Sequence, residues 1–220
     1  RFLKMRNISV KYNFTTDVIP MGHDINNLKD ERLTEETLLK KDTSIIDFLI
    51  VGTIEPRKAH LELLRVFELL WGIDKQVRLT YVGKMGWMAE DTIRKFVNSV
   101  HFKEQFFYFS QITDEELADL YKKTDVLIIP SYNEGFGLPI IEAMKYRKHI
   151  LARNIPVFRE ILGEDGNFFP DSNESEILLY LTKWIQKLRN GKIKKNDIKS
   201  ITWKISTDKI VNLLNKNASF

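Results

Sequence analysis

Short apolar runs alternate along the chain with longer segments in which apolar residues recur at helical spacing. Apolar runs of this length predict buried β-strands when glycine or polar turns follow them. We expect strands at residues 45–51, 76–82, 106–109, 126–129, 148–153 and 167–170. The intervening segments read as amphipathic helices. After residue 60, for example, Leu63, Val66 and Phe67 fall on one face, whereas Glu62 and Arg65 fall on another.

This alternation of strands and helices predicts the fold class. Successive strands joined by helices form right-handed crossover units, and these build a parallel sheet. The expected architecture is therefore α/β: a Rossmann-like parallel sheet with helices on both faces. In such a sheet the ligand binds at the carboxyl ends of the strands.

Cap signals set several helix boundaries. Thr113 and Glu116 have the spacing of a capping box, which predicts a helix over residues 114–123. Ser172 is expected to cap a later helix, and a last helix is expected from Trp203 to Asn215. A further helix is predicted over residues 88–100, with an inward face made of Ile93, Phe96, Val97 and Val100.

The most informative stretch runs from Ser131 to Ala143 and follows the predicted strand 126–129. Gly135 and Gly137 allow the backbone to come close to a ligand, and Pro139 suits the start of a helix. A helix start offers free N–H groups and a partial positive charge, which suit phosphate. Glu134 and Glu142 flank this loop and would repel phosphate, so their expected partners are hydroxyls. Phosphate with hydroxyls on either side describes a nucleotide sugar.

A second junction of strand, glycine and helix begins at Gly52 and Thr53 and carries the adjacent cations Arg57 and Lys58. A cation at a helix start opposes the helix dipole, which favours a ligand-binding role over an exposed surface pair. Lys84 follows the strand 76–82 and either faces the same ligand or serves as a turn lysine.

Composition narrows the alternatives. There is no cysteine, which excludes disulfide and thiolate chemistry and fits a reducing cytosol. The four histidines lack metal-ligand spacing, so no metal is expected. The net charge of +4 is too small to indicate nucleic acid, and no apolar run approaches the ~20 residues that span a bilayer. The basic stretch from Lys183 to Lys209 is either a solvated face or a patch for anionic lipid.

The stretch Glu-Gly-Phe-Gly-Leu-Pro, with a second glutamate eight positions after the first, resembles the donor-site motif of retaining glycosyltransferases of family 4. The resemblance implies the C-terminal half of a GT-B fold. Residues 1–15 would be a remnant of the inter-domain connection, residues 16–190 the nucleotide-sugar-binding domain, and residues 191–220 a linker and C-terminal helix. The acceptor-binding N-terminal half would precede this chain, which starts at Arg1.

The resemblance also implies roles for individual residues. Lys58 matches the lysine that holds the donor diphosphate, and Arg57 would replace the arginine whose usual position holds Thr53. Glu134 would bind hydroxyls of the transferred sugar, and Glu142 those of the ribose. Lys58, Arg57 and Glu134 are thus the expected catalytic residues. The donor would also be contacted by Gly52, Thr53, Lys84, Gln111, Ile112, Gly135, Phe136, Gly137 and Leu138, with the backbone at Gln111 and Ile112 reading the base.

The function implied is retaining transfer of a hexose from a nucleoside diphosphate sugar to a cell-surface glycan, without a cofactor. GDP-mannose is the favoured donor because Glu55-Pro56-Arg57-Lys58 is similar to the mannosyltransferase-like branch. The acceptor would be a glycan or a lipid-linked glycan, and the protein would be cytoplasmic, with a peripheral contact to the inner membrane as a further expectation.

Two other classes stay open at this stage: an epimerase or phosphorylase with the same fold, and a non-catalytic module that binds nucleotide sugars. A dehydrogenase is disfavoured because Ile140 stands where its fingerprint needs a third glycine or alanine. A serine hydrolase is disfavoured because Gly-x-Ser-x-Gly is absent.

Overall fold

The computed structural model describes Ile19, residues 44–195 and residues 203–217. Contacts along the chain divide it into two units, residues 27–199 and residues 1–26 with 200–220, which are described separately. The expected strand and glycine turn at 18–24 and the remnant at 1–15 fall almost wholly outside the described residues. Of the second unit, the structure describes the helix α8, Trp203–Asn217, where the sequence predicted 203–215.

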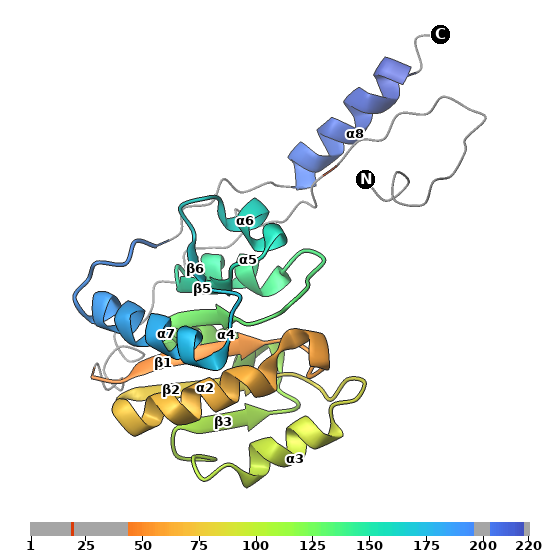
Figure 1. The fold of residues 1–220 in the computed structure, drawn as a ribbon. Helices are drawn as coiled ribbons and strands as arrows, with labels where there is room; N and C mark the ends of the chain where they lie inside the picture. Colours follow the sequence, from red (N-terminus) through yellow and green to blue (C-terminus); the bar gives the residue numbers. More distant parts are fainter. Residues whose placement is uncertain (1–18, 20–43, 196–202, 218–220) are drawn as a thin grey trace. The chain divides into compact units, whose positions relative to one another are not determined.

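The first unit is built on a six-stranded parallel sheet (Figure 1). Its strands are β1 Ile46–Val51, β2 Val77–Val82, β3 Phe106–Phe109, β4 Val126–Ile129, β5 His149–Arg153 and β6 Asn167–Phe169. Each pairs in parallel with its neighbours in the order β3-β2-β1-β4-β5-β6. The predicted parallel sheet is confirmed, with strand boundaries within one residue of those expected.

Helices cover both faces of this sheet, as the α/β prediction required. They are α2 His60–Ile73, α3 Glu90–Asn98, α4 Asp114–Lys123, α5 Leu138–Lys145, α6 Pro156–Leu162 and α7 Glu174–Arg189. Side chains of α2, α3 and α7 share one apolar core with one face of the strands, and those of α4, α5 and α6 share a second core with the other face. Along β1, Phe48 and Ile50 point into the first core and Leu49 into the second, which is the two-residue alternation of a strand covered on both sides.

Aromatic side chains fill the first core under α2 and α3. The Tyr81 ring meets those of Phe96 and Phe106 edge to face, with centroids 5.0 and 5.1 Å away. Two buried aromatic residues also make hydrogen bonds to the backbone. The Tyr81 hydroxyl donates to the His60 carbonyl at 2.8 Å, and Trp71 Nε1 donates to the Val77 carbonyl at 2.9 Å. These bonds fix the start and end of α2 against β2, and thereby position the loop that precedes α2.

The strand order reverses between β1 and β4. The chain moves outward from β1 to β2 and β3, then returns to add β4, β5 and β6 on the other side of β1. The loops that follow β1 and β4 therefore lead to opposite faces, and it is at such a reversal, at the carboxyl edge, that open α/β sheets bind ligands. Both glycine junctions predicted to bind phosphate begin at this edge.

Two helix details differ from the predictions. Helix α3 spans Glu90–Asn98, and Val97 and Val100 are 48% and 85% exposed, so only Phe96 and Ile93 pack inward as expected. Val100 lies beyond the helix end, where the helical period no longer decides its direction. The N-cap of α7 is Asn173 and not Ser172, because the Asn173 amide oxygen accepts from the Glu176 N–H at 3.1 Å.

Replacing each candidate cap should separate their roles. We expect Asn173→Ala to lower the free energy of unfolding by about 1 kcal/mol, because it removes the side-chain acceptor at the α7 N-terminus. Ser172 only donates to the exposed Glu176 carboxylate, so Ser172→Ala should cost less than about 0.5 kcal/mol. Urea unfolding of both variants tests this. A larger loss for Ser172→Ala would contradict the assignment.

Candidate functional site

The first part of the candidate site, called here the first wall, is the loop between β1 and α2. Gly52 follows the strand, and a single 3-10 turn, Pro56–Lys58, leads into the helix. Ala59 then takes a left-handed conformation, with φ of 52°, before α2 begins at His60. This short turn carries Lys58 back toward the sheet: a Cβ placed on Gly52 would lie 3.8 Å from the Lys58 Nζ.

The loop after β2 supports this wall from behind. A Cβ at Gly83 would lie 1.8 Å from the Gly52 carbonyl oxygen, so only glycine lets the two backbones approach this closely. The Ile54 N–H donates to the Lys84 carbonyl at 2.9 Å, and the Gly86 N–H donates to the Ile54 carbonyl at 3.0 Å. Lys84 and Thr53 are exposed on these loops, and their contact with a ligand stays a prediction.

The second wall is the loop after β4, and Glu134 on it meets both cations of the first wall. Lys58 Nζ forms an ion pair with Glu134 Oε1, and Arg57 Nη1 lies 3.3 Å from Glu134 Oε2. The Ser131 hydroxyl donates to Glu134 Oε1 at 3.0 Å. Arg57 also donates to the Asn133 carbonyl at 3.0 Å. The structure therefore brings Lys58, Arg57 and Glu134 together, as the sequence predicted.

Burial and charge act in opposite directions on Glu134. Partial burial raises the pKa of its carboxyl, but the hydrogen bond and charge of Lys58, with the Ser131 hydroxyl and Arg57, outweigh it and leave the pKa below the ordinary value. Its side chain is 8% exposed and that of Lys58 is 14% exposed. Lys58 is thus a sheltered, paired cation, and the reading of it as an exposed surface residue is wrong.

The glycine loop then turns into α5. Gly137 is the N-cap of this helix, with φ of 75°, and Pro139 lies in the first turn. Gly137 is buried and Phe136 half-buried, whereas Gly135 and Leu138 are exposed. A Cβ on Gly135 would meet no atom within 4 Å, so space is open at that point of the loop.

Glu142 extends from α5 toward α4. The buried Tyr121 hydroxyl donates to Glu142 Oε2 at 2.7 Å. Burial, followed by the charge of Glu142, raises the pKa of Tyr121, so the phenol keeps its proton and remains the donor. One carboxylate oxygen of Glu142 is thereby fixed by the protein.

Gln111 and Ile112 follow β3, which is two positions from β1 in the sheet. Gln111 is exposed, whereas Ile112 packs against the second core. Their role in reading the base stays a prediction. Sequence reasoning missed three other residues: Ser131, Tyr121 and Tyr132, whose N–H donates to the Arg57 carbonyl at 2.9 Å. Ser131 and Tyr132 adjoin the glycine motif, which is the signal that could have singled them out.

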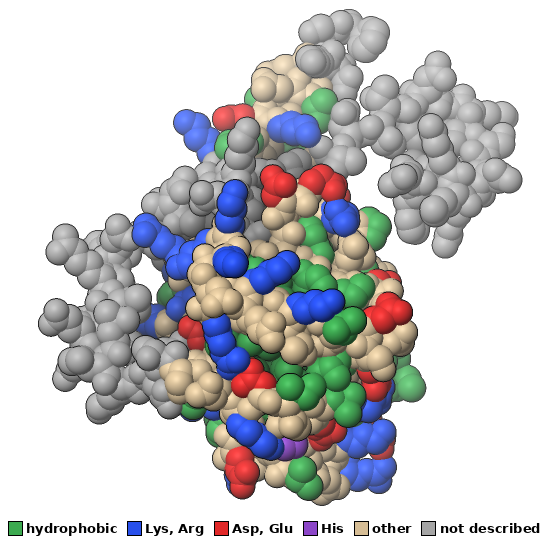
Figure 2. All heavy atoms as spheres, turned by 60° about the vertical axis from the view of Figure 1, so that its left-hand side comes forward, with side chains coloured by type: hydrophobic (Ala, Val, Ile, Leu, Met, Phe, Trp, Pro, Cys, Tyr) green, Lys and Arg blue, Asp and Glu red, His purple; other side chains and the backbone are tan. Residues whose placement is uncertain are grey.

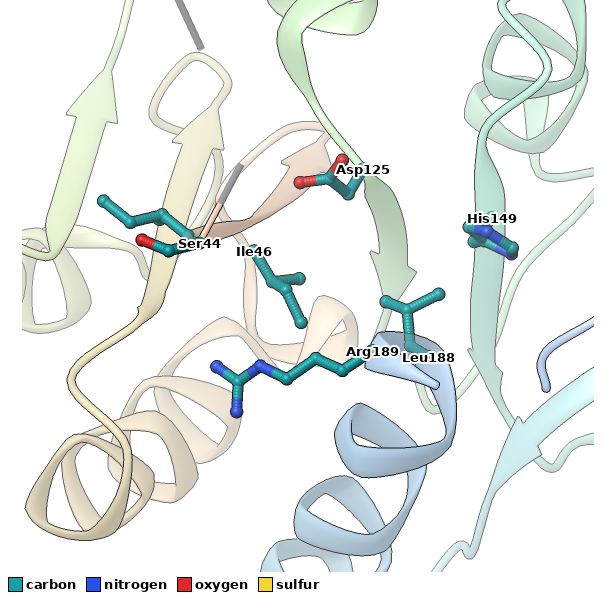
Figure 3. Close-up of a pocket in the computed structure, with 7 residues that line it drawn as sticks. Ser44, Ile46, Asp125, His149, Leu188 and Arg189 are labelled. Atoms are coloured by element: carbon teal, nitrogen blue, oxygen red, sulfur yellow. The ribbon is translucent and has the colours of Figure 1, made fainter. Parts of the chain in front are cut away.

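A separate hollow among the described residues lies away from these loops. It measures about 350 Å³ and is lined by Ser44, Ile45, Ile46, Asp125, His149, Leu188 and Arg189 (Figure 3). Ile46 and His149 are the first residues of their strands, so this hollow is at the amino edge of the sheet, opposite the paired loops. It contains none of the predicted site residues.

Metal and membrane features can be stated for the described part of the chain. Within it, no three His, Asp or Glu side chains gather in a way that could hold a metal ion. None of its helices combines the length and apolar character needed to cross a bilayer. Figure 2 shows lysine and arginine side chains spread among apolar ones on the face turned forward there. The lipid contact of the basic stretch 183–209 stays a prediction.

Comparison with known proteins places this geometry in context. Residues 31–200 match the family described as glycosyl transferases group 1. The chain is 36% identical over 174 residues to a serotype-specific mannosyltransferase, WbdA, of Escherichia coli, a match that covers 79% of this chain and 21% of the relative. It is 32% identical over 120 residues to the O-antigen chain mannosyltransferase B of E. coli, covering 54% and 31% respectively. The chain thus spans about a fifth of the length of WbdA.

Solved structures agree on the fold. The C-terminal domain of a glycosyl transferase group 1 family protein, LpcC, of Francisella tularensis is similar with a TM-score of 0.58. The match covers 80% of this chain and 87% of that domain at 19% sequence identity. The likeness therefore supports the predicted fold, the C-terminal half of a GT-B architecture.

His60 adjoins the first wall and makes stability depend on pH. Its ring is buried, and burial followed by the charge of Lys58 lowers its pKa from 6.5 to about 3. Between pH 6.5 and about 3 the unfolded chain protonates His60, whereas the folded chain keeps it neutral. The free energy of unfolding therefore decreases as the pH falls through this range. In His60→Asn this group is absent, so the free energy of unfolding should fall less steeply between pH 6 and 4 than in the wild type. The expected difference in slope is roughly 1 kcal/mol per pH unit. Parallel slopes in urea titrations of both proteins would contradict this.

Proposed function

The chain belongs to the glycosyl transferases group 1 family, and on this basis we propose that its sheet domain binds a nucleoside diphosphate sugar for transfer to a glycan. The observation that carries the proposal is the cluster of Lys58, Arg57 and Glu134 at the reversal of strand order. It places two cations and one acid in the crevice where open parallel sheets bind nucleotides.

Binding would exchange the partners within this cluster. The diphosphate takes the place of Glu134 on Lys58 and Arg57, because charge-assisted bonds to phosphate replace those to the carboxylate. Glu134 then accepts hydrogen bonds from hydroxyls of the transferred sugar. Because Glu134 remains hydrogen-bonded to Ser131, it keeps its position while its cationic partners move to the ligand. The diphosphate and the sugar are thus recognised by one coupled set of side chains.

The same groups would support the chemistry. Charge accumulates on the diphosphate as the bond from the sugar to phosphate breaks, and Lys58 and Arg57 neutralise it. The backbone from Gly135 to Leu138, with the α5 N-terminus, assists at the phosphates. Glu142, held through one oxygen by Tyr121, offers the other to the ribose hydroxyls. Lys84, Thr53, Gln111 and Ile112 complete the donor site at its rim. The transfer retains the configuration of the sugar, in keeping with the family 4 motif.

Mannose is the proposed sugar and GDP-mannose the proposed donor. Two relatives are named mannosyltransferases, and Glu55-Pro56-Arg57-Lys58 has the form expected for that branch. Arg57 and Glu55 pair at 2.6 Å, so this acid helps to orient the cation. The acceptor is proposed to be a surface glycan of the O-antigen kind, met at the membrane surface. A thermal-shift panel of nucleoside diphosphates and their sugars tests the donor.

Removing Lys58 should weaken the grip on diphosphate. We expect Lys58→Ala to lower the affinity for GDP and for GDP-mannose by roughly 10- to 100-fold, the loss of a charge-assisted bond. Lys95→Ala is a matched control, because Lys95 is an exposed lysine on α3 that pairs only with Asp91 in the described structure. Calorimetry of both variants provides the measurement. Equal affinities in the wild type and Lys58→Ala would remove Lys58 from the site.

Removing the charge of Glu134 should separate sugar from phosphate. In Glu134→Gln, Lys58 and Arg57 lose their internal anion, so GDP should bind at least as tightly as in the wild type. GDP-mannose should exchange a charged hydroxyl acceptor for the weaker amide oxygen, so the ratio of its affinity to that of GDP should fall roughly tenfold. Calorimetry with both ligands decides. An equal fall for both ligands would place Glu134 outside the sugar site.

A further inference from the structure

A buried arginine at the end of β5 has no part in the exchange described above. The Arg153 side chain is 1% exposed and is held in three directions. Its Nε donates to the Pro130 carbonyl at 2.6 Å, its Nη1 lies 2.9 Å from Asp171 Oδ1, and its Nη2 forms an ion pair with Glu62. Pro130 is the first residue after β4, so Arg153 grips the loop of Glu134 at its root.

The guanidinium also supports the loop further along. It lies over the Tyr132 ring at 4.5 Å from the centroid, a cation–π contact. Burial, followed by the Glu62 carboxylate, raises the pKa of the Tyr132 phenol, so this ring stays neutral beside the arginine. One side chain thus contacts the first and third residues of the loop that reaches Glu134 two positions later.

Tyr132 in turn contacts the loop that carries the proposed diphosphate-binding cations Arg57 and Lys58. The Tyr132 N–H donates to the Arg57 carbonyl at 2.9 Å, and Arg57 returns a bond to the Asn133 carbonyl at 3.0 Å. Glu62 belongs to the first turn of α2, four residues after Lys58. Arg153 therefore ties the loop that carries the acid to the helix that follows the cations.

We propose that Arg153 is a positioning residue that sets the placement of Glu134 toward Lys58 and Arg57, a proposal that rests on the function proposed above. Lysine cannot reproduce its action, since an ammonium lacks the planar fork that reaches a carbonyl and two carboxylates at once. A buried charge that only adds stability would affect all parts of the fold and both ligands alike. A positioning role predicts losses confined to the loop and to the sugar.

The first test uses Arg153→Lys in the 220-residue chain and needs no ligand. Amide exchange of Tyr132, followed by NMR, should quicken roughly tenfold because the loop is no longer held by the arginine. Arg189→Lys is the control: Arg189 makes a bidentate pair with Asp74, at 2.6 and 3.0 Å, near the amino edge. It should lower stability without a selective change at Tyr132. Unchanged Tyr132 exchange in Arg153→Lys would overturn the proposal.

The second test measures affinities. In Arg153→Lys the ratio of GDP-mannose to GDP affinity should fall roughly fivefold, and in a Glu134→Gln background the same substitution should leave the ratio unchanged. Glu62→Gln removes the charge that pairs with Arg153 Nη2, so it should also lower the ratio of GDP-mannose to GDP affinity. An equal loss of affinity for GDP and GDP-mannose in Arg153→Lys would overturn the proposal. So would a change in the affinity ratio that is as large in the Glu134→Gln background as in the wild type. If the wild type binds neither ligand, the proposed function fails, and the exchange of Tyr132 decides the positioning role alone.

Discussion

The ion pair between Lys58 and Glu134 joins two loops that the sheet itself separates. β1 and β4 are neighbours, yet the chain leaves them toward opposite faces, so no regular secondary structure connects the segments that follow. A cation from one loop and an acid from the other close this gap. Both are sheltered from water, and screening by salt is weak for such a pair. The side chains of the candidate site therefore also hold these two loops together.

The surrounding structure holds these atoms by backbone contacts and polar anchors. Gly83 lets the loop after β2 press against Gly52, and Tyr81 ties the start of α2 to β2. On the other side, Arg153 holds Pro130 and Tyr132. On the first wall, glycine lets two backbone segments lie close together. On the second wall, the buried guanidinium of Arg153 holds the loop in place. Both loops can be irregular because rigid elements fix their ends.

The fold could be predicted from the sequence because the local pattern of each segment agrees with the strand or helix that it forms. Apolar runs and helical periods located the strands and most helices, and the Thr113–Glu116 capping box is present as expected. Val100 was misplaced because periodicity cannot show where α3 ends, whereas Val97 lies within α3 but is 48% exposed. Lys58, Arg57 and Glu134 could be grouped because their loops follow strands of one parallel sheet. Arg153 and Tyr121 could not, because their contacts depend on tertiary distances that sequence spacing does not encode. Ser131 was missed although it belongs to the glycine stretch.

The pairing of Lys58 with Glu134 has a consequence for the selectivity of the proposed donor site. A simple anion such as inorganic phosphate can displace Glu134 only by stranding a sheltered carboxylate without its cationic partners, and an uncompensated charge of that kind is costly. In the proposed binding mode, a nucleotide sugar brings the anion and the alcohols in one molecule, so it would satisfy both Lys58 and Glu134. In the proposed function, Glu134 would thereby compete with small anions for Lys58 and Arg57, and it would give way to a ligand whose hydroxyls it can bind.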